Sequence, residues 1–494
     1  MECRMVQIFG RTRPVSISQP RCNSGQSSQL LLIAIAAVAP LACISYAAEG
    51  QTTWFVDDDA PGDPGPGTPL ISDPQEDGSL KHPYDAIQEA LDAALAGDEI
   101  VVGDGLYVGS GNRDLAFSVS ALLRSQSGAA QCIIDCESAG RGFVLTTAPV
   151  GELEIRGFTI TNGSAGDFGG GLIVGRGQPI RVYDCTFIAN SATFTGGAIY
   201  ATGAEMRFEA CSFVANTAVI APAVYAIDGT LALEACIFSM NAGAADGALF
   251  NDVNNTCGVT NCLFAGNMAT SAIGGGGAIL NNDAPLEITN CTLVNNSSAN
   301  VAGAIWADGG TVEVTNCILW GNTASQGSQL FAEDGASVIF SYSDTEGGAS
   351  GIDSEKGSSI AFLVGNIDAD PIFVASPFDY RLSQGSPCID AADNTASGLA
   401  AITSDLDSNV RFANDLESRD TGNGNCPIVD MGAYEFPSSC PWDADCDNQV
   451  GITDFLDLLA KWGTNPGGPP DVNGDGIVGI SDLLALLANW GPCP

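Results

Sequence analysis

The sequence predicts an all-β protein whose main part is a parallel β-helix with coils of about 26 residues, followed by a small α-helical module. Three observations predict it. A pattern of the form Cys-x-Phe/Leu-x-x-Asn returns six times between Ile180 and Asn322, and its cysteines are separated by 26, 25, 26, 29 and 26 residues. A second pattern, Gly-Gly-Ala-Ile, stands between these returns, for example from Gly196 and from Gly276. The tail carries two similar acidic loops, 28 residues apart. Self-similarity at a fixed period indicates a repeat architecture.

The repeat itself indicates strands that stack in register. It contains short apolar runs separated by Gly, Asn and Asp, without helical periodicity. One unit cannot bury its own apolar side and must stack on its neighbours, with a rise of about 4.8 Å per coil. Aligned residues then form columns of rings, of small buried thiols, and of asparagines that bond the backbone at a bend. The columns are Phe187, Phe213, Phe238 and Phe264; Cys185, Cys211, Cys236, Cys262, Cys291 and Cys317; and Asn190, Asn216, Asn241, Asn267, Asn296 and Asn322.

The cysteines indicate secretion and two kinds of sulfur chemistry. Seventeen cysteines are many for a cytosolic chain, whereas secretion permits disulfides. We expect the six repeat cysteines to stay thiols, because side chains of parallel strands in register point the wrong way for a disulfide torsion. The disulfides that we expect join Cys388 to Cys426 and Cys440 to Cys493.

The N-terminal part predicts a secreted protein. Residues 1–47 have the features of a signal peptide, with several arginines before an apolar run from Leu30 to Ile44 and a small-residue cleavage site at Ala47. No later stretch suits a membrane span. The mature chain begins with a strand at Trp54, followed by an amphipathic helix over 83–96 with Ile87, Leu91 and Leu95 on one face.

The charge excludes two classes of partner. Against 17 Lys and Arg stand 58 Asp and Glu, for a net charge of −41. Nucleic acids and anionic membrane surfaces bind basic patches, so neither is expected as a partner. The acidic balance favours divalent cations and an extracellular setting, and it also keeps a stacked β surface soluble.

The repeats resemble those of bacterial polymorphic outer-membrane proteins and, more broadly, the right-handed parallel β-helix proteins of the pectate-lyase-like superfamily. The resemblance covers roughly Trp54 to Asp344 and implies a right-handed solenoid, here assigned to residues 52–366, with the helix over 83–96 as its N-terminal cap. Such a cap covers strand edges and core that would otherwise be exposed. The resemblance implies no particular activity, since these folds carry lyases, hydrolases, adhesins and stalks.

Residues 367–437 form a distinct segment. The runs Ser386–Asp390, Asp405–Arg411 and Val429–Glu435 resemble a segment of secreted bacterial β-helix proteins that precedes C-terminal sorting or anchoring modules. Its acids are either a cation site or ordinary turn residues, because Asp is common in turns. These acids are Asp390, Asp405, Asp407 and Asp430.

Residues 438–494 carry the strongest chemical signal. Two loops, which begin at Asp443 and Asp471, place acceptors at positions 1, 3, 5 and 12 of a calcium loop, with a backbone carbonyl at position 7. Ca²⁺ is a hard cation that needs several converging oxygens, which short acidic side chains on a tight loop supply. The expected ligands are Asp443, Asp445, Asp447, Gln449 and Asp454 in the first loop, and Asp471, Asn473, Asp475, Ile477 and Asp482 in the second.

The duplicated loop–helix unit resembles a type I dockerin. It lacks the entering helix of an EF-hand and has Asp at position 12 of both loops. The resemblance implies a calcium-binding domain that docks onto a cohesin-like protein or a cell-surface component. It places the partner-binding residues at Ile452 and Thr453 in the first copy and at Ile480 and Ser481 in the second.

The solenoid sequence contains no evident catalytic set. A pectate-lyase mechanism needs an unprotonated Arg or Lys, and the chain has neither between Glu209 and Glu355. Arg181 and Arg207 lie one turn apart beside Glu154, which favours an ion-paired outer face. Three further acids line up roughly but occupy turns, where Asp is common. They are Asp283, Asp308 and Asp334.

Three functions stay open. The interpretation that we favour is a secreted, non-catalytic β-helix docked through its calcium-binding tail, with a polysaccharide as a second candidate ligand. The alternative is an extracellular polysaccharide lyase or glycoside hydrolase that carries the same tail. The third is a sugar-binding adhesin with exposed aromatic residues, for which Trp306, Trp320 and Tyr200 are the candidates, although core packing also explains them.

Overall fold

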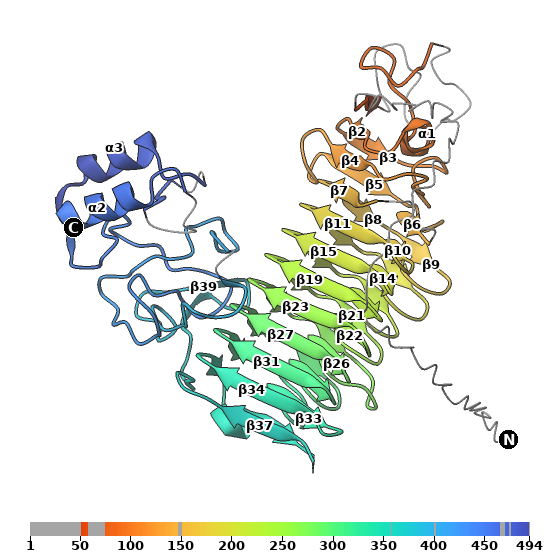
Figure 1. Cartoon of the computed structure of the whole chain (residues 1–494). Coiled ribbons are helices and arrows are strands. Elements are labelled where there is room, and N and C mark those ends of the chain that lie inside the picture. Colours follow the sequence, from red (N-terminus) through yellow and green to blue (C-terminus); the bar gives the residue numbers. More distant parts are fainter. Residues whose placement is uncertain are drawn as a thin grey trace, which may run out of the picture. The chain divides into compact units, whose positions relative to one another are not determined.

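The computed structural model of the chain describes residues 51–57, 75–146, 151–355, 357–399, 402–464, 470–473 and 476–493. The predicted signal peptide, residues 1–47, and the predicted ligand Asp475 lie outside the described residues. The described part is a parallel β-solenoid of the right-handed type with about ten coils, and it contains three α-helices (Figure 1). Within it, no helix has both the length and the apolar character that crossing a bilayer requires.

Sheet I is the longest of four parallel sheets, with 12 strands in register. Its strands are β1 (Thr53–Val56), β2 (Glu99–Val102), β4 (Leu122–Ser125), β7 (Leu153–Arg156), β11 (Pro179–Tyr183), β15 (Glu205–Glu209), β19 (Thr230–Glu234), β23 (Thr256–Thr260), β27 (Pro285–Thr289), β31 (Thr311–Thr315), β34 (Ser337–Ser341) and β37 (Ser359–Phe362).

Sheet II follows in each coil and holds 10 strands. They are β3 (Gly105–Tyr107), β5 (Cys132–Asp135), β8 (Thr159–Thr161), β12 (Thr186–Ile188), β16 (Ser212–Val214), β20 (Ile237–Ser239), β24 (Leu263–Ala265), β28 (Thr292–Val294), β32 (Ile318–Trp320) and β35 (Asp344–Thr345). Sheet III is a short side of 6 strands, namely β9 (Ser164–Ala165), β13 (Ser191–Ala192), β17 (Thr217–Ala218), β21 (Ala242–Gly243), β25 (Met268–Ala269) and β29 (Ser297–Ser298).

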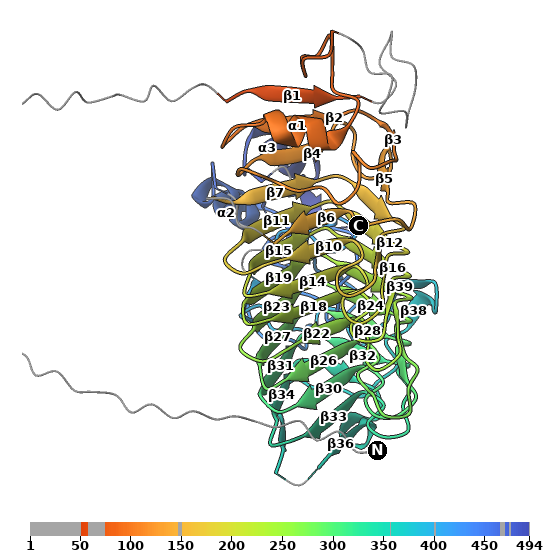
Figure 2. The same ribbon diagram turned by 90° about the vertical axis from the view of Figure 1, so that its right-hand side faces the viewer.

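Sheet IV closes each coil with 9 strands. They are β6 (Phe143–Leu145), β10 (Leu172–Val174), β14 (Ile199–Thr202), β18 (Val224–Ile227), β22 (Leu249–Asn251), β26 (Ile279–Asn282), β30 (Ile305–Asp308), β33 (Leu330–Glu333) and β36 (Ile352–Ser354). Figure 2 shows these strands stacked in chain order along the solenoid. Most strands of sheets I and IV alternate buried and more exposed residues, which is the pattern of strands with one face toward a core.

The predicted column of rings is confirmed. Phe187, Phe213, Phe238 and Phe264 are fully buried on sheet II, and their ring centroids are 5.4, 4.7 and 4.4 Å apart in parallel stacks. The register continues the column through Leu293. Because each ring contacts the equivalent ring of the next coil, the stack contributes dispersion as well as burial.

The predicted thiol column is confirmed as well. The six repeat cysteines are buried and unbridged. The sulfur of Cys262 accepts the backbone N–H of Cys236 at 3.3 Å, and Cys291 and Cys317 repeat this contact in the next coils. Burial raises the pKa of the Cys185 thiol to about 12, although backbone donors act in the opposite direction. Buried thiols of this kind are unreactive packing residues.

The predicted asparagine column is confirmed, and it bonds successive coils. The Asn216 amide donates to the carbonyl of Phe187 at 2.9 Å and to Asn241 Oδ1 at 3.0 Å, while Asn241 Oδ1 also accepts the backbone N–H of Asn216. The residue in the left-handed conformation is the one before each asparagine, such as Ala215 at φ +52° and Met240 at φ +55°. The asparagine therefore stabilises a bend that its predecessor makes.

The predicted N-terminal helix is shorter than expected. Helix α1 (Ile87–Ala93) buries Ile87 and Leu91 in the solenoid core, but Leu95 is 56% exposed and lies beyond the helix. The carboxylate of Asp98 accepts the backbone N–H of Leu95 at 2.9 Å and also binds Thr52 and the Trp54 indole. This network turns the chain before another helical turn can form.

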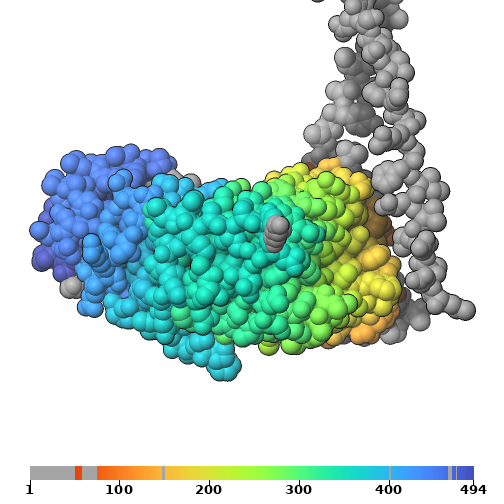
Figure 3. All heavy atoms as spheres, turned by 90° about the horizontal axis from the view of Figure 1, so that it is seen from below, coloured from red at the N-terminus to blue at the C-terminus, as the bar shows by residue number. Residues whose placement is uncertain are grey.

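Residues 367–437 pack against the outer face of sheet II. Tyr380 is buried against Leu263 and Val294, and Met431 lies in a second apolar cluster with Ile318. This segment contains the antiparallel pair β38 (Phe373–Ala375) and β39 (Asp379–Leu382). In the space-filling view (Figure 3), the cyan and blue residues of the segment adjoin the green and teal coils. A short 3-10 turn, η1 (Gly348–Gly351), precedes the segment.

Candidate calcium-binding and docking site

In the predicted C-terminal module, residues 438–494, the described residues form two equivalent halves. Helix α2 (Ile452–Ala460) and helix α3 (Ile480–Ala488) follow the two acidic loops, and β40 (Gln449–Val450) pairs with β41 (Gly491–Pro492). Val450 is paired with Gly491, and Val478 exchanges backbone hydrogen bonds with Gly463 and Thr464. Each half thus pairs the end of its loop with the residues that follow the other helix. A two-fold relation of this kind is what an internal duplication produces.

The hydrogen bonds inside the loops repeat in the same way. Asp454 accepts the backbone N–H of Ala444 at 2.7 Å and of Gly451 at 2.7 Å. Asp482 accepts from Val472 at 3.1 Å and from Gly479 at 2.8 Å. In both helices this carboxylate stands at the third position, where it caps the first turn. Position 12 therefore closes the loop onto its own backbone.

The first loop gathers carboxylates to one point. Ligand oxygens of Asp443, Asp445 and Asp447 lie within 4.8 Å of one another. Burial raises the pKa of Asp443 to about 6; the backbone donors at Asn448 and Asp447 oppose this, while Asp454 and Asp445 add to it. Carboxylates clustered on a tight loop suit a hard divalent cation. A bound cation would neutralise their negative charge, which is costly to bury without a positive partner.

The second loop places its residues equivalently. Asp471 and Asp482 are buried, whereas Asn473 and Ile477 are exposed. Asp471 accepts the backbone N–H of Gly476 at 2.9 Å, as Asp443 accepts that of Asn448 at 2.8 Å in the first loop. Gln449, like Ile477, is exposed in its loop. The described residues of both loops thus have the arrangement of a matched pair.

One predicted disulfide is confirmed and the other is wrong. Cys440 and Cys493 are joined, with Cα atoms 5.7 Å apart. Cys426 bonds to Cys446 instead of Cys388, and Cys388 is a buried thiol beside Asp344. The packing of residues 367–437 explains the error, because it carries Cys388 into the apolar cluster on sheet II and leaves Cys426 facing the first loop. Cys446 stands between two predicted ligands, so this loop is covalently tied to the preceding segment.

The described part of the module leaves more large apolar residues exposed than it buries in its core. Val450, Leu458, Val478 and Leu486 form its core together with Cys440. Phe455 and Leu483 are half-buried against this core. Four other apolar residues of each copy stay exposed, three on the helix and one tryptophan just beyond its end. These residues, hereafter the apolar rows, are Ile452, Leu456, Leu459 and Trp462, exposed by 63, 57, 46 and 45%, and Ile480, Leu484, Leu487 and Trp490, exposed by 61, 60, 50 and 49%.

The four predicted partner-binding residues lie in the first turns of the two helices. Ile452 and Thr453 in α2, and Ile480 and Ser481 in α3, are all exposed. The rest of the apolar rows escaped the sequence analysis. The signal was present, because Phe455-Leu-Asp-Leu-Leu459 places apolar residues around most of a helix, and a short helix cannot bury them all.

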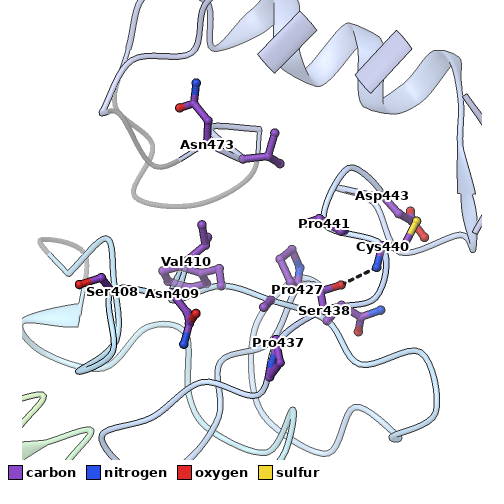
Figure 4. Close-up of a pocket in the computed structure, with 14 residues that line it drawn as sticks. Ser408, Asn409, Val410, Pro427, Pro437, Ser438, Cys440, Pro441, Asp443 and Asn473 are labelled. Atoms are coloured by element: carbon purple, nitrogen blue, oxygen red, sulfur yellow. Dashed lines mark hydrogen bonds between the residues drawn. The ribbon is translucent and has the colours of Figure 1, made fainter. Parts of the chain in front are cut away.

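A cavity of about 340 Å³ lies between the loops of the module and residues 408–437 (Figure 4). Asn473 stands on one side, with Val410 and Pro427 across from it. Asp443 also lines the cavity, near Cys440, whose N–H donates to Ser438 Oγ at 3.1 Å. Both loops therefore border the same cleft.

The arginines of sheet I are ion-paired. Arg181 lies in register with Arg207 and Glu154, as expected, but its guanidinium binds Glu152. Arg207 binds Glu234 at 2.5 Å and Glu209 at 3.3 Å. These side chains are half-exposed, so each pair contributes little to stability. The hydrogen bond to Glu152 raises the pKa of the Arg181 guanidinium above its usual value, so Arg181 stays protonated.

The three aligned acids lie close enough for the charges of Asp283 and Asp334 to act on Asp308. Asp283 and Asp334 occupy bends with φ +48° and +47°, where Asp and Asn are favoured. Burial raises the pKa of Asp308, and the charges of Asp334 and Asp283 raise it further. Trp306, Trp320 and Tyr200 are each half-buried by neighbouring side chains.

The four acids of residues 367–437 separate into two places. Asp390 and Asp430 are buried together, with the Asp390 N–H donating to Asp430 at 2.7 Å. Asp405 accepts the backbone N–H of Asp407, Asn409 and Glu435, and Asp407 faces Arg381 at 3.5 Å. The sequence analysis missed a fully buried ion pair between Arg411 and Glu435, whose atoms are 3.6 Å apart.

Comparisons with solved structures find polysaccharide lyases at low similarity. Pectate lyase Pel9A is 13% identical, with 78% of this chain and 97% of that chain covered and a TM-score of 0.42. A rhamnogalacturonan lyase is 12% identical over 66% and 91%, with a TM-score of 0.33. The alginate lyase from Paenibacillus sp. str. FPU-7 is 12% identical over 57% and 96%, with a TM-score of 0.26. No protein-family model and no curated protein matches the sequence. Similarity at this level says nothing about activity, and the fold rests on the strand pairing itself.

Proposed function

We propose that this chain is a secreted, non-catalytic β-solenoid that is attached to a protein partner through a calcium-binding, dockerin-like C-terminal module. The observation that carries the proposal is the duplication of two features together, an acidic loop and an exposed apolar row. Four apolar residues stay exposed at equivalent places of both copies, from Ile452 to Trp462 and from Ile480 to Trp490. Exposed apolar patches of this kind mark surfaces that bind a partner.

Calcium would organise this surface. In the first loop the carboxylates of Asp443, Asp445 and Asp447 would hold the ion, with the Gln449 carbonyl and Asp454; in the second, the equivalents are Asp471, Asn473, Asp475, Ile477 and Asp482. The ion would supply positive charge and fix each loop against the first turn of its helix. Because Ile452 and Ile480 lie in these turns, the ion would set the apolar rows in their binding positions.

A cohesin-like protein or cell-surface component is the proposed partner. The test immobilises a panel of type I cohesin modules and measures binding of the full mature chain in calcium and in chelator. Leu456→Ala combined with Leu484→Ala removes one exposed side chain from each apolar row. The control is Val219→Ala, because Val219 is 42% exposed and lies on the solenoid. The proposal expects calcium-dependent binding that the paired variant weakens by roughly tenfold or more and the control leaves unchanged. Calcium-independent binding, or equal binding by the paired variant, would contradict it.

The alternative is a polysaccharide-degrading enzyme with the same module. It is tested by incubating the mature chain with acidic and neutral polysaccharides, with and without calcium. We expect neither unsaturated nor reducing ends, because the arginines of sheet I are engaged by Glu152, Glu209 and Glu234. Release of either kind of end would replace the non-catalytic interpretation.

A further inference from the structure

A groove of about 500 Å³ lies between the outer face of sheet II and the β38–β39 hairpin. Met240 and Asn295 line it from the solenoid side, and Phe378, Arg381, Asp407 and Tyr434 line it from residues 367–437. The groove belongs neither to the module nor to the ion-paired face of sheet I. Its size is in the range of small-ligand sites.

The wall of the groove is held rigidly. Tyr380 is only 7% exposed and packs with Leu263 and Val294. Its hydroxyl accepts a hydrogen bond from the Asn295 amide at 3.1 Å, and its ring meets that of Phe373 edge-on at 5.5 Å. A wall built this way needs little reorganisation when a ligand binds, which favours affinity.

Two apolar side chains at the mouth of the groove are exposed. Phe378 is 92% exposed at the tip of the hairpin, where its N–H donates to the carbonyl of Ala375 at 2.7 Å. Met240, from the solenoid side, is 62% exposed. A single exposed apolar residue is ordinary, but these two line the same groove. They place exposed apolar surface beside the polar groups of the groove.

The polar groups combine both signs of charge. Arg381 binds Asp379 at 2.8 Å and faces Asp407 at 3.5 Å, with side chains that are 59, 22 and 40% exposed. The carboxylates accept hydrogen bonds and the guanidinium donates them, so a ligand with many hydroxyls satisfies both. Two carboxylates against one guanidinium leave the groove negative, within a chain of net charge −41. This balance disfavours an anionic ligand.

We propose that the groove binds a short stretch of a neutral polysaccharide. The apolar face of a sugar ring would lie on Phe378, and its hydroxyls would bond Asp379, Arg381 and Asp407. The inference rests on the proposed function in one respect. It takes the solenoid to bind the polysaccharide without cleaving it, while the module attaches the chain to its protein partner.

The test is calorimetric titration of the full mature chain with neutral hexasaccharides of glucose, mannose and xylose, and with hexagalacturonate. All titrations contain chelator, so failure of calcium-dependent docking and failure of the groove are separate results. We expect at least one neutral hexasaccharide to bind, and hexagalacturonate to bind more weakly. Phe378→Ala should lower that affinity by roughly five- to tenfold, because it removes the aromatic contact with the sugar ring. Arg381→Ala should lower it by a similar factor, because it removes hydrogen bonds to the sugar hydroxyls.

The control is Phe194→Ala. Phe194 is 55% exposed and does not line the groove. Both Phe378 and Arg381 are exposed, so the variants are expected to fold, and their unfolding curves verify it. The proposal is overturned if no neutral hexasaccharide binds, if the two groove variants bind as tightly as the parent chain, or if hexagalacturonate binds best.

Discussion

The solenoid and the C-terminal module keep their cysteines in opposite states. Ten described cysteines, all in the solenoid and the segment packed on it, are buried thiols, whereas Cys426, Cys440, Cys446 and Cys493 form two disulfides in or at the module. The solenoid buries a continuous core because each coil covers the next. The module buries only a handful of apolar residues. The difference shows that size decides where cross-links are needed, since a small core rarely stabilises a domain by itself.

The largest expected effect breaks the solenoid at its stack of rings. Phe238→Ala should lower the free energy of unfolding by about 3–5 kcal/mol. The Phe238 ring is fully buried between Phe213 and Phe264, and its removal would leave a cavity. Denaturant unfolding followed by strand circular dichroism measures it. The exposed Phe194→Ala serves as control, and a loss below about 1 kcal/mol for Phe238→Ala would show that the stack is loosely packed.

The next effect breaks the module while leaving the solenoid intact. Cys440→Ser combined with Cys493→Ser opens a loop of 53 residues and should cost the module about 2–4 kcal/mol. The helical circular dichroism signal and the fluorescence of Trp462 and Trp490 should then change at a lower denaturant concentration than in the parent chain. The matched control, Cys236→Ala, changes a buried solenoid thiol and should shift only the strand signal. If the helical and strand signals shifted together in both variants, the module and the solenoid would not be stabilised separately, which would contradict the comparison.

A smaller effect sharpens the comparison through pH. Burial, and to a smaller extent the charge of Asp252, raises the pKa of Asp246 to about 7. Between about pH 4 and pH 7 the folded chain therefore holds a proton that the unfolded chain, with a pKa near 3.9, has released. The stability contributed by this proton is present below about pH 4 and is lost as the pH rises to about 7. Asp246→Asn should therefore raise the free energy of unfolding by roughly 1–3 kcal/mol at pH 8 and hardly at pH 4.

Unfolding of the parent chain and of Asp246→Asn at the two pH values checks this. The exposed Asp104→Asn, between β2 and β3 of the solenoid, is the control and should show no such difference. Equal effects of Asp246→Asn at pH 4 and pH 8 would mean that folding does not raise the pKa of the Asp246 carboxyl group.

The sequence predicted the columns of the solenoid and missed contacts between distant segments. Phe187, Cys185 and Asn190 recur at one period, so their neighbours are their own copies and can be named without coordinates. Leu95 fits the helical spacing, but Asp98 ends the helix by a contact that periodicity does not contain. The partner of Cys426 depends on how residues 367–437 pack on sheet II, and no local pattern encodes that packing.

The candidate site divides in the same way. The loop acids follow fixed spacings within each copy, so their clustering at Asp443, Asp445 and Asp447 was predictable. The apolar rows and the groove at Phe378 depend on which side chains remain exposed after the module and the hairpin have packed. Exposure is a property of the assembled structure, and the sequence offers only the excess of apolar residues as a hint.

The central claim, a calcium-organised docking module, is tested most directly by counting the ions. Equilibrium dialysis of the mature chain against Ca²⁺, with a parallel sample of Asp445→Asn and Asp447→Asn combined, measures the number bound. The account predicts two ions per chain and about one for the paired variant. Zero bound ions, or equal uptake by both samples, would contradict it.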